Sequence, residues 1–142
     1  VDHEVTSKIA QTACLAAGVP NIKTGDKTSI NTIPYLYYCE PIQGKDIFGK
    51  KIESDIHVDI SSTIAMKEKM LGCHKSQRNW LLKISKVDSY ITMMKEYSKN
   101  KGREINCDYA EGFRQHLGFS YPSGNILKSE LNDLVFTKDT AL

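Results

Sequence analysis

The sequence predicts a layered α/β fold on two observations. Two short runs with strand-like composition, 33–41 and 56–60, lie between amphipathic stretches with helical spacing. The chain contains no Pro/Gly/Ser-rich linker that would divide it, and two strands are too few for a stable sheet of their own. We therefore expect the 142 residues to be one part of a single domain, the C-terminal portion of a Rossmann-like layered α/β domain.

The first helix is expected over 4–17, because apolar residues recur there at helical spacing. It ends before Gly18, a residue type that favours helix C-termini, and before Pro20, which cannot continue a helix. A polar loop is expected over 21–32.

The two strands differ in pattern. Residues 33–41 are rich in aromatic and aliphatic side chains and indicate a buried strand that ends at Pro41. Residues 56–60 alternate between apolar and polar side chains, which predicts a second strand. The intervening residues 42–54 contain two glycines and indicate a loop or a short hairpin.

A second helix is expected from a cap at Ser61 or Ser62 to about Gln77, with Gly72 inside it at a cost of ~1 kcal/mol. Residues 78–85 continue as a turn or short helix.

A third helix is expected over about 84–101, closed by Gly102. Its apolar face is made of Ile84, Val87, Ile91 and Met94. Residues 103–116 are expected to be short and irregular, and the tail after Tyr121 to contain one more weak helix.

The charge pattern does not favour a nucleic-acid or membrane partner. The chain has 19 basic and 17 acidic residues, and its lysines form no run of the kind that marks nucleic-acid or membrane binding. No apolar run in it is long enough to span a bilayer, and no signal peptide is visible at the start of the sequence. We expect no nucleic-acid partner, no membrane partner and a cytoplasmic location.

The cysteines support the same compartment. Cys14, Cys39, Cys73 and Cys107 include no Cys-x-x-Cys pair and lie in apolar stretches. We expect buried, reduced thiols that pack as small hydrophobic side chains.

His3 is the sharpest candidate for chemistry. A histidine in the first helical turn lies near the positive end of the helix dipole, which favours the neutral imidazole that a metal needs. Asp2 can orient a second imidazole or a metal-bound water. The alternative is that Asp2 caps the helix and His3 is a solvated first-turn residue, since one histidine is no metal site.

Other candidates have plainer explanations. Lys67 and His74 share a helix face, where they form either its polar edge or, less simply, a catalytic pair. Glu111, at an expected turn with Gly112, is better suited to tying down a loop than to catalysis. His57 and His116 are expected to be structural or solvated.

Four segments occur in the order and spacing of one family: "VDHEVTSKIAQTACLAAG", "PYLYYCEP", "HVDISSTIAMKEKMLGCHKSQ" and "DYAEGFRQH". They resemble the C-terminal half of the LmbE/PIG-L family, the zinc-dependent N-acetyl-sugar deacetylases. The branch they resemble most is the GlcNAc-malate deacetylases of bacillithiol synthesis. The likeness runs from Val1 to about Arg114.

In that family, a His and an Asp of an N-terminal HPDDE-type motif hold the metal together with the His of a later Asp-His pair. Asp2-His3 matches the later pair, so the resemblance implies that His3 is a zinc ligand and Asp2 its supporting neighbour. No HPDD motif occurs in the chain, so the N-terminal part of the domain is expected to be absent and the chain alone inactive.

The resemblance also implies a reaction. Zinc with three protein ligands and an open position lowers the pKa of bound water to about 7 and polarises an acetyl carbonyl. The expected substrate is a small N-acetyl amino sugar conjugate, of the GlcNAc-malate type, and the full-length enzyme is expected to be a homo-oligomer. The alternative is a non-catalytic fragment that binds a sugar or a partner.

Overall fold

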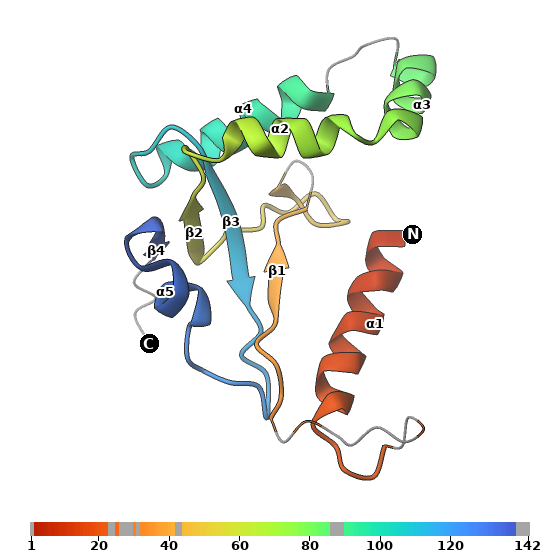
Figure 1. Ribbon diagram of the computed structural model, residues 1–142, viewed down its shortest axis with the longest axis vertical. Coiled ribbons are helices and arrows are strands. Elements are labelled where there is room, and N and C mark those ends of the chain that lie inside the picture. Colours follow the sequence, from red (N-terminus) through yellow and green to blue (C-terminus); the bar gives the residue numbers. More distant parts are fainter. Residues whose placement is uncertain are drawn as a thin grey trace. The chain divides into compact units, whose positions relative to one another are not determined.

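The computed structural model describes residues 2–22, 25, 30, 32–41, 44–85 and 90–138 (Figure 1). Within them the chain forms five α-helices, one short 3₁₀-helix and four strands. In chain order these are α1 (Asp2–Ala17), β1 (Tyr37–Cys39), β2 (Ile56–Asp59), α2 (Ile64–Gly72), α3 (Lys75–Ser85), α4 (Tyr90–Arg103), β3 (Ala110–Gln115), α5 (Ile126–Leu131), η2 (Asn132–Leu134) and β4 (Val135–Thr137).

The strands form a single sheet in the order β1-β3-β2-β4. The central strand β2 is antiparallel to both neighbours, with His57 opposite Gly112 on β3 and opposite Phe136 on β4. The α/β class predicted from the sequence is confirmed, whereas the strand pairing is antiparallel and not the parallel arrangement of a Rossmann-like sheet. The buried apolar residues lie on these strands; they are Ile56, Val58, Ala110 and Val135.

The chain forms two compact units. The first comprises Val1–Tyr38 and Arg114–Ile126, and the second comprises Cys39–Phe113 and Leu127–Leu142. Helix α1 belongs to the first unit, and α2, α4, β2 and β4 belong to the second.

In the first unit, the predicted helix over 4–17 is confirmed as α1, but the expected apolar face has no buried residue. Ile9 is 63% exposed. Tyr121 donates its hydroxyl to the backbone oxygen of Gln11 at 2.9 Å, and the Gln11 side chain bonds to the Tyr38 hydroxyl. Polar contacts therefore position this helix within its unit. The predicted loop over 21–32 falls largely outside the described residues.

In the second unit, the single helix expected up to Gln77 is divided into α2 and α3. The N–H groups of Cys73 and His74 bond three residues back, to Met70 and Leu71, which tightens the chain and ends α2. Gly72 is the last residue of α2 and not an interior one. Residues 78–85 continue α3 without a turn.

The start of α2 also differs from expectation. Its N-cap residue is Thr63, whose side chain makes no capping hydrogen bond. The Ser61 hydroxyl instead contacts Tyr109, accepting its N–H at 3.1 Å. A serine predicted as a cap therefore joins the end of β2 to the start of β3.

The prediction that residues 103–116 are irregular was wrong, because they contain β3. The third predicted helix is confirmed as α4, although Ile84 lies on α3 and Val87 lies outside the described residues. The weak tail helix is confirmed as α5, and the sequence did not reveal β4. Strand β1 is shorter than expected, three residues between flanking prolines. Residues 45 and 51 pair across the predicted hairpin.

No helix in the described part of the chain is long and apolar enough to cross a membrane.

Candidate functional site

Asp2 and His3 lie in the first turn of α1, and both side chains are exposed. His3 is therefore accessible to a metal ion. The described residues contain no group of three or more His, Cys, Asp or Glu side chains placed to hold one. These residues alone do not fit a complete zinc site, because a tight site needs three or four convergent donors.

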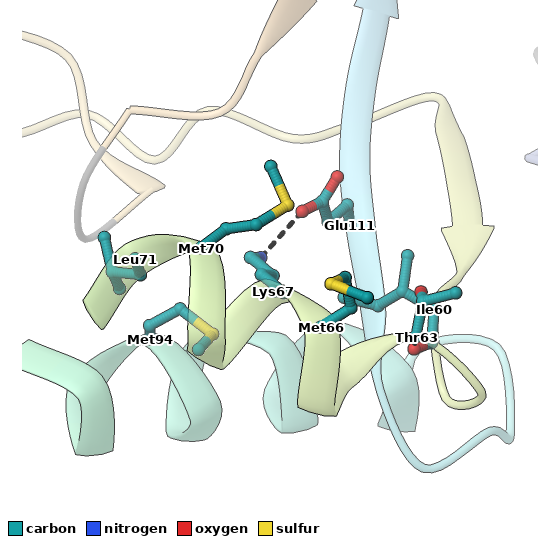
Figure 2. A pocket seen from close by; sticks show the side chains of 8 residues that line it. All are labelled: Ile60, Thr63, Met66, Lys67, Met70, Leu71, Met94 and Glu111. Carbon is teal, nitrogen blue, oxygen red and sulfur yellow. Dashed lines mark hydrogen bonds and ion pairs between the residues drawn. The ribbon is translucent and has the colours of Figure 1, made fainter. Parts of the chain in front are cut away.

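A groove of about 460 Å³ lies in the second unit, between α2, α4 and the start of β3 (Figure 2). Its walls are mainly apolar and rich in methionine. The lining residues are Ile60, Thr63, Met66, Lys67, Met70, Leu71, Met94 and Glu111. Methionine side chains adapt to varied apolar shapes, so this surface can accommodate an apolar group.

Lys67 and Glu111 meet at this groove (Figure 2). The Lys67 Nζ lies 2.7 Å from Glu111 Oε1 and donates to the Ser98 hydroxyl at 3.1 Å. A turn was expected at Glu111, but the residue lies on β3, opposite Val58. The structure thus joins two of the residues that the sequence singled out, whereas His74 is exposed between α2 and α3.

Next to this pair in β3, Gly112 lies against a buried carboxylate. A Cβ on Gly112 would lie 2.8 Å from Glu40 Oε1 and closer still to the Ser54 hydroxyl. The position therefore requires a glycine for close approach, which explains the glycine that suggested a turn.

Glu40 is the centre of a buried polar network. Its carboxylate is 2% exposed and lies 2.7 Å from Lys101 Nζ, and it accepts hydrogen bonds from Ser54 and Tyr97. Burial raises the pKa of Glu40, but hydrogen bonds from Lys101, Ser54 and Tyr97 outweigh burial and hold it below its usual value. Burial and the bond to Glu40 raise the pKa of the Tyr97 phenol.

The network continues through Glu104. Lys101 donates to Glu104 Oε1 at 2.9 Å, and Glu104 Oε2 lies 3.0 Å from His57 Nε2. Burial opposes ionisation of Glu104, yet hydrogen bonds and charges from Lys101 and Lys138 lower its pKa to about 2. His57 is completely buried, and its Nδ1 has no hydrogen-bond partner among the described residues.

His57 is therefore structural, as expected. His116 is half-buried: its Nδ1 lies 2.6 Å from the Tyr38 hydroxyl, and its ring centroid lies 4.0 Å from that of Tyr121.

The four cysteines are free, as expected, but the prediction that they are buried was wrong, because Cys39 and Cys73 are exposed.

No protein-family model matches this chain, and no solved structure matches it.

The buried network could not be predicted from the sequence, because its members are far apart in the chain and follow no motif. One signal was present. Glu40 ends an apolar stretch immediately before Pro41, and a carboxylate in such a place needs a partner when it is buried.

Proposed function

We propose that this chain is part of a zinc-dependent N-acetyl-sugar deacetylase of the LmbE/PIG-L type. The proposal rests on the resemblance of four segments that follow one another in the order of that family. One structural observation supports it: three of these segments meet in the second unit. The segment that contains β2 and α2 contributes Lys67, which pairs with Glu111 of the segment that contains β3. Residues 39–41 of a third segment lie beside β3, because the Glu40 N–H donates to the Gly112 oxygen at 3.4 Å.

In this proposal His3 is one ligand of the zinc ion and Asp2 its polar neighbour. The described residues do not complete the site, so the remaining ligands must come from outside them. The substrate is a small N-acetyl amino sugar conjugate of the GlcNAc-malate type, and the products are acetate and a free amino sugar. The working form is a cytoplasmic homo-oligomer.

The test uses the natural protein that contains this chain. Zinc content is measured by mass spectrometry and acetate release is measured on GlcNAc-malate. We expect His3→Ala to lose zinc and at least about a hundredfold in turnover, since changing a residue that only hydrogen-bonds to a metal ligand already costs about 10–100-fold. His116→Asn, whose amide can keep the bond to Tyr38, is the control and should stay within a few-fold of wild type.

Full zinc occupancy and normal turnover in His3→Ala would remove the residue-level basis of the proposal. Turnover only on a lipid-linked GlcNAc would be consistent with the proposed enzyme class but would contradict the proposed substrate. The 142 residues alone are expected to bind zinc weakly and to hydrolyse no N-acetyl sugar.

A second candidate is a non-catalytic piece that binds a sugar or a partner. The exposure of Val5 and Ile9 on α1 favours it, because a helix with apolar side chains on its surface is suited to contact with another surface. Sugar binding by calorimetry without acetate release from the natural protein would support this candidate.

A further inference from the structure

The hairpin between β1 and β2 (Figure 1) contains two large apolar residues whose side chains are exposed. Ile47 is 81% exposed and Phe48 is 88% exposed, side by side at the tip. Exposed apolar residues are ordinary when scattered, but an adjacent aliphatic-aromatic pair at a loop tip suggests a contact surface.

Hydrogen bonds hold this tip in one shape. Asp46 Oδ1 accepts the N–H groups of Phe48 and Lys50, both at 2.9 Å, and the Asp46 N–H donates to the Lys50 oxygen at 2.9 Å. Gly49 has a φ of 79°, a conformation that glycine adopts readily. The apolar pair is therefore held outward by the backbone and is not a consequence of a loose loop.

Three lysines lie close to the apolar tip in the hairpin sequence. Lys45 and Lys51 face each other across the hairpin, and Lys50 is next to the tip; all three are exposed. The hairpin also contains two acidic side chains, and both have partners within it. Asp46 accepts hydrogen bonds from the backbone of the turn, and the Glu53 carboxylate, at the base of the hairpin, lies 3.2 Å from Lys51 Nζ.

We propose that this hairpin docks on an anionic lipid surface, with Ile47 and Phe48 inserted among the acyl chains and the lysines at the phosphate level. Lysine stems pack along apolar surface while their ammonium groups reach polar headgroups, so exposed lysines beside an apolar tip fit the interface of a bilayer. The sequence alone predicted no membrane contact because its lysines form no long basic run. Three of them nevertheless lie in this one hairpin, on either side of Ile47 and Phe48 in the sequence.

A lipid surface fits better than a protein groove. The tip is narrow, only two apolar residues wide, and a stable protein interface needs about 800 Å² on each partner. Weak, reversible membrane binding needs only a small apolar insertion combined with a few basic residues. The proposal is independent of the deacetylase assignment, because it uses none of the residues assigned there.

The test is co-sedimentation of the natural protein with vesicles of phosphatidylcholine alone or with about 30% phosphatidylserine. We expect binding to the anionic vesicles only, weakened by salt. Phe48→Ser should lower the partition coefficient about tenfold. Changing Lys45, Lys50 and Lys51 together to Gln should lower it by up to about a hundredfold, at roughly fivefold per lysine.

Matched controls separate the tip from exposed residues elsewhere. Phe119→Ser removes an aromatic side chain that is 97% exposed but lies outside the hairpin, and it should leave binding unchanged. A triple change of the exposed Lys69, Lys75 and Lys99 to Gln removes the same charge from the helices.

Three outcomes overturn the proposal. One is the absence of wild-type binding to anionic vesicles. Another is an equal loss in the hairpin and control variants, which would indicate attraction by overall charge. The third is a Phe48→Ser protein that keeps its lipid binding but changes oligomeric state in sedimentation, which would assign the tip to a contact between copies.

Discussion

Lys67 on α2 and Glu111 on β3 are joined by an ion pair, with 2.7 Å between Nζ and Oε1. The two side chains are 31% and 37% exposed, so water and salt screen their attraction. The Lys67 ammonium also donates to Ser98, which is completely buried. This pair connects a helix to the sheet at the edge of the methionine-rich groove.

The first prediction concerns the strength of this pair. A double-mutant cycle with Lys67→Met and Glu111→Gln should give a coupling of about 0.5–1 kcal/mol in the free energy of unfolding, because exposed pairs contribute little. The Lys95–Glu68 pair, at 2.5 Å and with similar exposure, is the control and should give a coupling of the same size. A coupling several times larger for Lys67–Glu111 would show that the pair is desolvated in solution.

The second prediction concerns the buried pair of Glu40 and Lys101, which are 2% and 8% exposed. Glu40→Gln leaves the Lys101 ammonium buried with less compensation, so it should destabilise the protein by about 3 kcal/mol or more in urea unfolding. Glu53→Gln disrupts the exposed pair with Lys51 and should cause no measurable change. Equal effects of the two variants would mean that burial does not determine the strength of these interactions.

The third prediction concerns Gly112. Gly112→Ala would push a methyl group against Ser54 and Glu40 and should cost about 1–3 kcal/mol of stability. Gly72→Ala is the control, because Gly72 is the last residue of α2 and an added Cβ there meets nothing within 4 Å, so the free energy of unfolding should change by no more than about 0.5 kcal/mol. The unfolding temperature should therefore fall for Gly112→Ala and stay close to that of the wild type for Gly72→Ala. A neutral Gly112→Ala would show that the sheet can separate from Glu40 at little cost.

These residues also show what could be predicted from the sequence. Helix α1 and strand β2 were predicted because periodicity and composition determine them locally. Strand β3 was not, because its Gly112 has the signature of a turn when its neighbours are unknown. The glycine is explained only by Ser54 and Glu40, which are distant in sequence and reach it through the fold.

The candidate site divides in the same way. His3 and Lys67 were identified from their residue types and their positions on helices. Glu111 was not identified as the partner of Lys67, because no residue near Glu111 in the sequence indicates its position in the sheet. Strand β3 places Glu111 opposite Val58, within reach of α2. The buried network depends on long-range burial, for which a single sequence contains little information.

The last prediction concerns pH. Burial lowers the pKa of His57 below its usual 6.5, although the charge of Glu104 and its hydrogen bond act in the opposite direction. The charges of Lys101 and Lys138 lower it further. Protonation would also place an N–H at Nδ1, for which the described part of the chain offers no hydrogen-bond acceptor. The folded protein therefore favours the neutral ring.

The sign of the effect follows from linkage. Since the pKa of His57 is lower in the folded state, the unfolded state binds more protons below pH 6.5. The contribution to stability is complete above that pH and is lost as the pH falls through the folded value. Glu104, with its pKa lowered to about 2 from a usual 4.5, contributes stability that is lost only at lower pH. Between about pH 7.5 and 5 the carboxylate of Glu104 therefore does not obscure the histidine.

We expect the free energy of unfolding, measured in urea at steps across this window, to fall as the medium is acidified. His57→Gln cannot be protonated in this range and keeps an amide donor toward Glu104, so it should lower stability at pH 7.5 but flatten the pH dependence. His74→Gln alters an exposed histidine and should retain the wild-type slope. An unchanged slope in His57→Gln would assign the acid sensitivity to other groups, because only loss of the buried imidazole predicts the flattening.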